Sequence, residues 1–259
     1  MGMQQVRAKK FLGQHFLTDL SVAARIADTV DAFPEIPILE VGPGMGVMTQ
    51  FLMQKARELK VVELDYESVE YLRRKYPDFE DNIIEDDFLK MHLENVFGKP
   101  FVLTGNYPYN ISSQIFFKML EYKDQIPCCT GMIQKEVAER LAAKPGTKAQ
   151  GIISILVQLW YDVEYCFTVP PTVFNPPPKV QSAVIVMRRN SRQDAGCDEQ
   201  LLVRIVKQSF QQRRKMLRGS LKGLMPDGHE FGSLRPEQLG VEDFIRLTND
   251  IGRARGEKN

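Results

Sequence analysis

The chain has 259 residues, of which 43% are hydrophobic and 26% are charged, and its 34 Lys and Arg nearly balance 33 Asp and Glu. This composition excludes a disordered chain, because the apolar residues suffice for a core, and the formal charge of +1 excludes a histone-like polycation. The length accommodates one large domain and a small second one.

The cysteines and the N-terminus give no sign of a metal site, a disulfide framework or a membrane anchor. Cys128, Cys129, Cys166 and Cys197 have neither Cys-x-x-Cys spacing nor a histidine cluster beside them. No stretch approaches the roughly 20 apolar residues that span a bilayer, and residues 1–10 hold no apolar signal core. We therefore expect a cytoplasmic protein in a reducing compartment, without a metal and without a membrane partner.

Short β-rich segments alternate with helical patterns over the first two-thirds of the chain. This alternation predicts a parallel sheet covered by helices, that is, a doubly wound α/β domain. The expected strands are 38–41, 60–64, 82–85, 101–104, 130–133, 163–168 and 183–187. The expected helices are 21–30, 48–55, 66–75, 112–121, 135–143 and 151–159.

Two segments interrupt or end this pattern. Residues 169–179 hold five prolines, which exclude a helix or a central strand and predict a semi-rigid extended loop. Residues 190–196 are small and polar and look like a linker, and the rest of the chain is helical in pattern without a strand signal. We therefore expect two domains, residues 1–190 and residues 191–259.

A glycine-rich turn follows the first expected strand. Gly42-Pro43-Gly44-Met45-Gly46 lies between a strand and a helix, where backbone can approach a nucleotide-type cofactor. The dinucleotide fingerprint would place its third glycine at Val47, so an S-adenosylmethionine loop, with Glu40 before Gly-x-Gly-x-Gly, fits better than an NAD loop. A tight turn without a ligand is the alternative.

Acidic residues stand at the ends of three successive expected strands. Glu40 precedes the glycines, Glu63 can accept hydrogen bonds from both ribose hydroxyls, and Asp87 can accept from the exocyclic amine of adenine while Phe88 covers the ring. A single strand-end acid is more often solvated. Three on one edge of a sheet indicate a cofactor pocket.

The segment Asn106-Tyr107-Pro108-Tyr109 follows the fourth expected strand and suggests the chemistry. An exocyclic amine of a nucleobase is a weak nucleophile, because its lone pair is delocalised into the ring. The Asn106 side-chain oxygen and a backbone carbonyl held rigid by Pro108 can accept both amine protons and favour a pyramidal nitrogen. Tyr109 can stack on the base during in-line methyl transfer. A turn with a packed tyrosine is the alternative.

The ordered set of motifs resembles the ribosomal RNA adenine dimethylases, most closely the KsgA/RsmA branch that modifies small-subunit rRNA. The resemblance covers nearly the whole chain. It is carried by residues 10–17, 40–46, 62–65, 106–111, 134–137, 169–186 (with Phe174-Asn175-Pro176-Pro177-Pro178-Lys179-Val180) and 210–215.

The resemblance implies a fold, a cofactor and a set of site residues. The fold is a Rossmann-like class I methyltransferase sheet with a small C-terminal α-helical domain, so that residues 1–190 are catalytic and residues 191–259 bind RNA. The cofactor is S-adenosyl-L-methionine, held by His15, Leu17, Gly42, Gly44, Glu63 on ribose, Asp87 on adenine and Asn106 near the methyl donor.

The resemblance also implies how the target adenine is held. Asn106, the backbone of Tyr107 and Pro108, and Tyr109 hold the base, and Phe174 on the proline loop closes its other face. Two positions depart from the family pattern: Tyr107 is usually aliphatic there, and His15 is often Asn, which suggests a contact through the backbone at that position.

The implied activity is dimethylation of the N6 amine of two adjacent adenosines near the 3′ end of small-subunit rRNA, by a monomer acting on an immature 30S particle. A large-subunit rRNA dimethylase of the antibiotic-resistance type is the alternative within this class. Two further alternatives are an NAD-dependent oxidoreductase, which leaves residues 106–109 unexplained, and a catalytically idle ribosome-assembly factor.

Basic residues gather in the C-terminal region and near the N-terminus. Residues 201–222 hold no acid, and Lys207, Gln211, Arg214, Arg218 and Lys222 would share one stripe of a single helix, beside an apolar stripe of Leu202, Val206, Phe210, Leu217 and Leu221. Such a helix can track phosphates, whereas an ordinary solvated face is the alternative. Arg7, Lys9 and Lys10 would form a second unopposed basic cluster. The other cations of the region are Arg204, Arg213 and Lys215.

Overall fold

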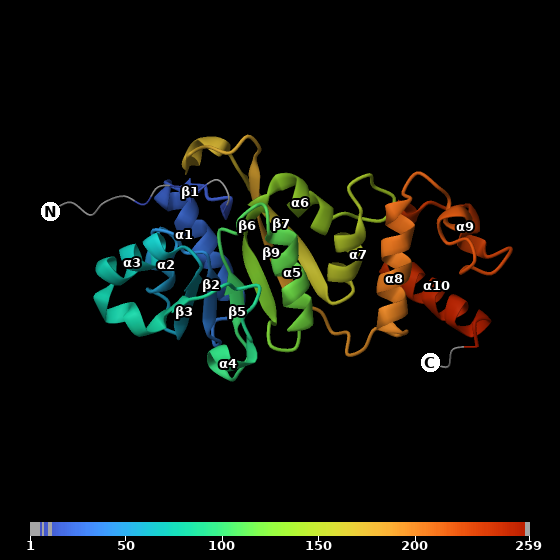
Figure 1. Ribbon diagram of the computed structural model, residues 1–259, viewed down its shortest axis with the longest axis horizontal. Helices are drawn as coiled ribbons and strands as arrows, with labels where there is room; N and C mark the ends of the chain where they lie inside the picture. Colours follow the sequence, from blue (N-terminus) through green and yellow to red (C-terminus); the bar gives the residue numbers. More distant parts are fainter. Residues whose placement is uncertain (1–5, 7, 10–11, 257–259) are drawn as a thin grey trace. The chain divides into compact units, whose positions relative to one another are not determined.

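The computed structural model describes residues 6, 8–9 and 12–256, and the chain divides into two compact units (Figure 1). The first unit comprises the chain up to residue 138 together with 163–189, and the second comprises 139–162 together with the chain from 190 onward. The break after residue 189 adjoins the expected domain boundary. Residues 139–162 differ from that expectation, because their helix packs against C-terminal helices and therefore groups with them.

A seven-stranded sheet forms the centre of the first unit, in the order β4-β3-β2-β5-β6-β9-β7. The pairs β4–β3, β3–β2, β2–β5 and β5–β6 are parallel, and β9 is antiparallel to β6. Each strand expected from the sequence is present within a few residues. Their bounds are β2 (Ile38–Val41), β3 (Leu59–Glu63), β4 (Ile83–Glu85), β5 (Val102–Thr104), β6 (Cys128–Gln134), β7 (Tyr161–Val169) and β9 (Ser182–Arg189).

Helices and short 3-10 turns connect these strands. Every residue of β2 and β5 is buried, which requires cover on both faces of the sheet and explains why these strands lack a polar alternation. The helix expected at 48–55 is shorter, because the chain turns away after Leu52. The bounds are α1 (Leu20–Asp28), η2 (Thr29–Ala32), α2 (Thr49–Leu52), α3 (Tyr66–Lys75), η3 (Pro77–Asn82), α4 (Glu94–Phe97), α5 (Ser112–Glu121) and α6 (Lys135–Leu141).

A second, two-stranded sheet joins the N-terminal segment to the proline-rich segment. β1 (Phe16–Leu17) pairs antiparallel with β8 (Phe174–Asn175), which follows η4 (Pro171–Val173). Thr18 adds two bonds, since both its backbone N–H and its hydroxyl donate to the Val173 carbonyl, at 2.8 and 2.9 Å. Two-residue strands carry no hydrophobic alternation, so the sequence pattern gave no signal of this pairing.

The second unit is helical in its C-terminal part. Its elements are α7 (Ile152–Gln158), α8 (Glu199–Gln211), α9 (Leu217–Ser220), η5 (Glu230–Ser233), η6 (Pro236–Gln238) and α10 (Val241–Ala254). The hydrophobic face of α10 is buried, and α7 and α10 both pack against α8. The expected helical region without strands is therefore present, over the part of 190–256 that the structure describes.

The expected single helix across residues 201–222 is wrong. α8 ends at Gln211, the backbone of Gln212 leaves the helical region with φ −115° and ψ 43°, and α9 starts only at Leu217. The turn allows Leu217 and Leu221 to be fully buried, while the Gln208 side-chain amide donates to the Ser220 carbonyl at 2.9 Å. The basic residues consequently lie on α8, on the turn after it, on α9 and, for Lys222, just beyond α9, rather than on one stripe.

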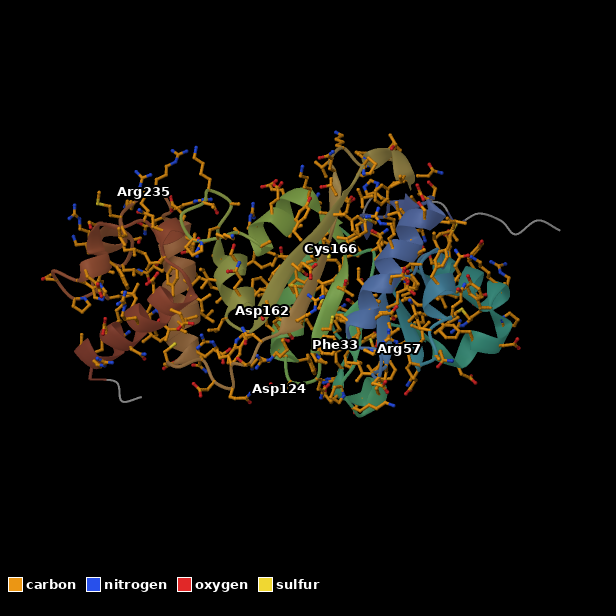
Figure 2. The ribbon with its side chains drawn as sticks, turned by 180° about the vertical axis from the view of Figure 1, so that it is seen from behind. Phe33, Arg57, Asp124, Asp162, Cys166 and Arg235 are labelled. Atoms are coloured by element: carbon orange, nitrogen blue, oxygen red, sulfur yellow. The ribbon has the colours of Figure 1, made fainter. Side chains whose placement is uncertain are left out.

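A buried arginine, Arg57, lies just before β3, at the edge of the sheet opposite to the glycine turn. Only 6% of the Arg57 side chain is exposed, and its guanidinium donates to the Phe33 carbonyl and, at 3.4 Å, to the Ile36 carbonyl (Figure 2). Its other nitrogen pairs with Asp31 at 2.9 Å. Arg57 thus satisfies backbone carbonyls of the loop that leads into β2.

Replacing Arg57 with methionine is expected to lower the free energy of unfolding by about 2–4 kcal/mol, because buried carbonyls lose their donor and Asp31 loses its partner. Urea denaturation monitored by circular dichroism measures this change. The exposed Arg74, changed to methionine in the same way, is the matched control and should stay within about 0.5 kcal/mol of the unmodified protein. Equal losses in the two variants would contradict the structural role of Arg57.

Candidate functional site

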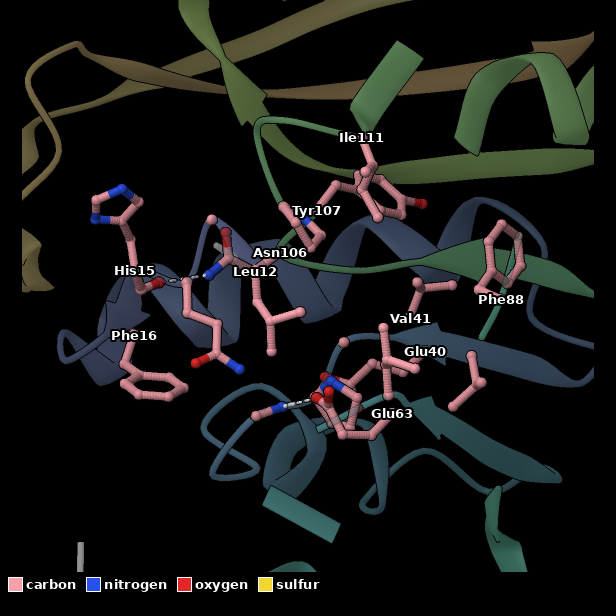
Figure 3. Close-up of a pocket in the computed structure, with 18 of the residues that line it drawn as sticks. Leu12, His15, Phe16, Glu40, Val41, Glu63, Phe88, Asn106, Tyr107 and Ile111 are labelled. Atoms are coloured by element: carbon pink, nitrogen blue, oxygen red, sulfur yellow. Dashed lines mark hydrogen bonds between the residues drawn. The ribbon is translucent and has the colours of Figure 1, made fainter. Parts of the chain in front are cut away.

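A pocket opens at the carboxyl ends of the parallel strands of the first unit (Figure 3). It encloses about 1030 Å³, counting the space open to solvent at its mouth. Nine of the ten predicted site residues line it, so segments that are distant in sequence converge here. They are His15, Leu17, Gly42, Gly44, Glu63, Asp87, Asn106, Pro108 and Tyr109.

The glycine turn forms the floor of this pocket. Gly44 has a φ of +55°, a conformation that side chains disfavour, and a Cβ there would lie 3.0 Å from the ring of Phe16. The backbone N–H of Gly44 donates to the Glu63 carboxylate at 3.0 Å (Figure 3). A glycine at this position therefore permits both the turn and the close packing of the N-terminal segment against it.

Glu63 ends β3 and is oriented by two backbone donors. Besides Gly44, the N–H of Asp65 donates to its other carboxylate oxygen at 2.9 Å. Burial raises the pKa of Glu63, and these two N–H groups oppose that rise. Each carboxylate oxygen has a second lone pair, so Glu63 retains the capacity to accept further hydrogen bonds from a ligand.

Glu40 lies deeper, in β2, and is almost completely buried at 1% exposure. Its carboxyl accepts a hydrogen bond from the Thr49 hydroxyl at 2.7 Å. Burial, with the nearby charge of Glu63, raises the pKa of Glu40 to about 8. Around neutral pH this carboxyl is therefore largely protonated in the folded protein.

Asp87 follows β4 in a tight turn. One of its carboxylate oxygens accepts from the Leu89 N–H at 3.0 Å, and the other lies 3.1 Å from the ammonium of Lys90, whose side chain is 81% exposed. Phe88 lines the same part of the pocket and is buried (Figure 3). The turn thus presents a carboxylate and an aromatic ring to the pocket together.

Asn106 follows β5 and is held by the N-terminal segment. Its side-chain amide nitrogen donates to the His15 carbonyl at 3.1 Å (Figure 3). The strand can leave the sheet so closely beside β2 because residue 105 is glycine: a Cβ there would lie 2.5 Å from the Val41 carbonyl oxygen. With its nitrogen engaged, the Asn106 amide has its oxygen in place to accept hydrogen bonds.

Tyr107, which departs from the family pattern, belongs to the core. Its side chain is 1% exposed, and its hydroxyl donates to the Thr130 carbonyl at 2.8 Å. Its ring packs edge-on against Phe116, with ring centroids 5.8 Å apart. The added hydroxyl is therefore satisfied internally.

Tyr109 is fixed from two sides. Its hydroxyl makes a hydrogen bond with Ser182, and the ring of His15 stacks on it at a centroid distance of 5.4 Å and an interplanar angle of 30°. Burial raises the pKa of the Tyr109 hydroxyl, so this group stays protonated. These two contacts consequently fix the orientation of its ring.

His15 contacts the site through both its backbone and its ring. Its carbonyl accepts from Asn106, as the family pattern suggested for a backbone contact, and its Nδ1 lies 2.8 Å from the Pro176 carbonyl oxygen. Gly13, two residues earlier, lies so close to Asn110 that a Cβ at Gly13 would be 2.5 Å from the Asn110 side-chain oxygen. The N-terminal segment is thereby docked onto the loop that carries Asn106 and Tyr109.

One expectation for the site does not fit the structure, and one stays a prediction. Phe174 is 4% exposed, pairs with Leu17 and packs in the core cluster, and its place on the second face of a base stays a prediction. Lys9 is not unopposed, because its ammonium pairs with Asp65 and with Glu67, the latter at 3.2 Å. Arg7 and Lys10, the other members of that cluster, lie outside the described residues.

The charge of the pocket fits a cationic ligand. Its described lining includes four carboxyl groups, those of Glu40, Glu63, Asp86 and Asp87, and no lysine or arginine. A ligand that carries a sulfonium and an ammonium group is attracted by such a lining. In the described part of the chain no group of His, Cys, Asp and Glu is arranged to hold a metal, and no helix is both long and apolar enough to cross a membrane.

Several residues of the site were not singled out from the sequence. Gln14 lines the pocket and bonds to Asp65 at 3.3 Å, and Phe16 packs on Gly44. Asp65 is 4% exposed and ties Lys9, Gln14 and Ser68 together. The only signal for Asp65 is its place two residues after Glu63, and Phe16 has none beyond the motif of residues 10–17.

The strand order, the acid-lined pocket and the glycine turn define a class I methyltransferase fold. A solved dimethyladenosine transferase from Plasmodium falciparum superposes with a TM-score of 0.78 over 93% of this chain and 98% of that chain, at 23% identity. The 23S rRNA methyltransferase ErmE superposes with a TM-score of 0.69 over 90% of this chain and 99% of that chain, at 27% identity. The fold expected from the sequence is confirmed.

The family follows from the sequence comparisons. The model of the ribosomal RNA adenine dimethylase family matches residues 5–243. The ribosomal RNA small subunit methyltransferase A of Bacteroides thetaiotaomicron is 66% identical over 258 residues, which cover 97% of both chains. The chain belongs to the ribosomal RNA adenine dimethylase family. It is an S-adenosylmethionine-dependent methyltransferase of rRNA, and the oxidoreductase alternative is not supported.

The buried carboxyl of Glu40 predicts a pH-dependent stability. Its pKa rises from 4.5 to about 8 on folding, so the folded state binds the proton more tightly, and stability falls as pH rises between these values. Glu40→Gln, which has no such proton, should gain stability relative to the unmodified protein by up to ~1.4 kcal/mol per pH unit between pH 5 and 8. Urea denaturation at a series of pH values measures the difference.

The exposed Glu58, changed to glutamine in the same way, is the control and should follow the profile of the unmodified protein. Parallel profiles for Glu40→Gln and the unmodified protein would show that Glu40 is ionised in the folded state throughout this range.

Proposed function

We propose that this enzyme dimethylates the N6 amine of two adjacent adenosines near the 3′ end of small-subunit rRNA, as a cytoplasmic monomer acting on an immature 30S particle. The observation that carries the proposal is the placement of Asn106, Pro108 and Tyr109 at the rim of an acid-lined cofactor pocket. The name of the relative that is 66% identical supports the small subunit as the substrate. The more distant 23S rRNA methyltransferase, at 27% identity, supports a large-subunit substrate less.

In this proposal the acids and the glycine turn hold the cofactor. Glu63 accepts from the ribose hydroxyls, Asp87 accepts from the adenine amine, and Phe88 covers the adenine ring. Gly42 and Gly44 carry no side chains that would enter the space of the methionine part, and their positive φ disfavours any residue with a side chain there. His15 and Leu17 close the pocket from the N-terminal segment. The bound cofactor supplies an electrophilic methyl group on a sulfonium sulfur.

Asn106 and Pro108 prepare the nucleophile. The Asn106 amide nitrogen is already engaged by His15, which directs its oxygen to accept one proton of the target amine. The backbone of Tyr107 and Pro108, held rigid by the proline ring, offers the carbonyl that accepts the other amine proton. Two acceptors draw the amine hydrogens out of the plane of the base, so the nitrogen lone pair becomes available for attack on the methyl carbon.

Tyr109 supplies orientation rather than acid–base chemistry. Its raised pKa keeps the hydroxyl protonated, and its bond to Ser182 and stack with His15 fix the ring. A base stacked on that ring is held in line with the methyl donor, and such positioning supplies much of the acceleration of a bimolecular transfer. After transfer, the cationic methylated amine releases one of its two protons to solvent and keeps the other, which permits a second cycle at the same site.

The second unit offers a surface for RNA phosphates. Arg214, Lys215 and Arg218 are exposed on the turn after α8 and on α9. The Arg213 guanidinium donates to the Lys148 carbonyl, so the loop that carries exposed Lys144 and Lys148 lies beside this turn. We define these residues, Lys144, Lys148, Arg213, Arg214, Lys215 and Arg218, as the basic turn surface. It replaces the single basic helix stripe as the proposed site of phosphate contact.

The activity is tested with a labelled methyl donor, immature small subunits and protein-free large-subunit RNA. We expect label in two dimethylated adenosines of small-subunit rRNA. Asn106→Ala should reduce transfer by roughly 10²–10³-fold or more, because one acceptor for the amine protons is lost, while binding of the methyl donor stays detectable by calorimetry.

Label only in large-subunit RNA would contradict the proposed substrate and support the large-subunit dimethylase alternative. Label in neither RNA would contradict the proposed activity and support the alternative of a catalytically idle ribosome-assembly factor. Full activity of Asn106→Ala would exclude the role proposed for that side chain.

The basic turn surface predicts salt-sensitive RNA binding. Changing Arg214 and Lys215 to glutamine should weaken RNA binding roughly tenfold at physiological salt and reduce the slope of log affinity against log salt by roughly 1.4, because two phosphate contacts are lost. Filter binding at several salt concentrations measures both quantities. Arg246 and Arg253 on α10, changed to glutamine together, carry the same loss of charge and should have little effect. Equal losses in the two double variants would point to net charge alone.

A further inference from the structure

Lys118 is a buried cation of α5 whose ammonium is held by backbone carbonyls. Only 7% of the residue is exposed, and its Nζ donates to the Leu89 carbonyl at 3.0 Å and to the Met91 carbonyl at 2.6 Å. The rings of Phe88 and Tyr122 lie 5.8 and 5.5 Å from the same nitrogen. No ion pair of the described residues includes it. A buried charge without a carboxylate partner is costly, so these carbonyls and rings must compensate for its lost hydration.

Both carbonyls belong to the turn that carries Asp87. The backbone of Leu89 is held on both sides, because its N–H donates to the Asp87 carboxylate at 3.0 Å while its carbonyl accepts from Lys118. Met91 is held in the same way: its N–H donates to the Asp87 carbonyl at 3.1 Å and its carbonyl accepts from Lys118. Lys118 therefore closes the turn of residues 87–91 from behind.

The turn faces the pocket while Lys118 does not. Asp87 and Phe88 line the pocket, and Lys118 is absent from the lining. The orientation of the Asp87 carboxylate depends on the Leu89 peptide, and the position of the Phe88 ring is bounded by the Lys118 ammonium. Without this cation, two buried carbonyls would lack their donor, and the turn would have to open toward water to satisfy them.

We propose that Lys118 is a positioning residue for the adenine end of the cofactor, which acts by holding the turn of residues 87–91 so that Asp87 and Phe88 face the adenine. This inference rests on the proposed contact between Asp87 and the adenine amine. The helix α5, which begins just after the loop of Asn106 and Tyr109, would thus also contribute to recognition of the purine of the methyl donor.

The experiment compares two ligands that differ at the group which Asp87 contacts. S-adenosylhomocysteine carries the 6-amino group, and S-inosylhomocysteine carries an oxo group in its place. Calorimetry on the full-length protein should give a preference for the amino ligand of at least about tenfold, as expected for a hydrogen bond to a charged group. Asp87→Ala should lose this preference.

Lys118→Met should reduce the preference for the amino ligand below about threefold and raise the KM for the methyl donor by about threefold or more. Its kcat at saturating donor should change less than about twofold, because the adenine contact is remote from the transferred methyl group. Lys118→Arg should restore most of the preference, since a guanidinium can donate to both carbonyls. The exposed Lys99→Met is the matched control and should leave the preference unchanged.

The outcomes separate the two proposals. Equal binding of both ligands by the unmodified protein, or an undiminished preference in Asp87→Ala, would overturn the adenine contact and the role of Lys118 with it. Loss of the preference in Asp87→Ala with full preference in a folded Lys118→Met would overturn the role of Lys118 alone. Should Lys118→Met fail to fold in thermal denaturation, Lys118→Gln takes its place, and full preference in that variant would again overturn the inference.

Discussion

Parallel pairing of β3, β2 and β5 is the constraint on which the site depends. Parallel strands leave a sheet at the same edge, so Glu63 and Asn106 come to flank the glycine turn although they are far apart in sequence. The pairing must be close there, because Gly105 approaches the Val41 carbonyl too nearly for any side chain. The buried strands thus fix this edge of the sheet, and the turns that follow them carry the proposed binding and reacting groups.

The near-zero net charge conceals a strict separation of charges. Acids line the pocket, and burial holds the pKa values of Glu40 and Glu63 above their ordinary range. Two of the cations beside the pocket are engaged elsewhere, since Lys9 pairs with Asp65 and Lys118 is held by carbonyls of the neighbouring turn, whereas the exposed Lys90 lies 3.1 Å from the Asp87 carboxylate. A cationic ligand therefore meets carboxyl groups in a described lining that holds no lysine, and its arrival favours their ionised forms.

The sequence was informative wherever local pattern decides structure. Strand 38–41 and the helices at 66–75 and 112–121 have the expected bounds, because hydrophobic runs and adjacent turn residues determine them locally. Long-range contacts decided the rest. Phe174 is buried because it pairs with Leu17, and the helix after 201 breaks at Gln212 because Leu217 and Leu221 must return to the core. Neither partner is visible in a local window, and the same holds for Lys118, whose carbonyl partners carry no sequence signal.

The N-terminal segment contacts both the glycine turn and the loop of residues 106–109. Phe16 packs on the glycine turn, the His15 carbonyl holds Asn106, the His15 ring stacks on Tyr109, and Thr18 bonds to the proline segment. One short segment therefore touches the glycine turn and the loop of residues 106–109 at the same time. The conformational entropy lost on ordering this segment is lost only once. Each contact that orders the segment therefore makes the other contacts of the same segment more favourable. In the proposed function, a cofactor that holds residues 15–17 in place also orients the Asn106 amide, which accepts a hydrogen bond from the nucleophile. Binding of the methyl donor would then favour the base-binding arrangement of the site.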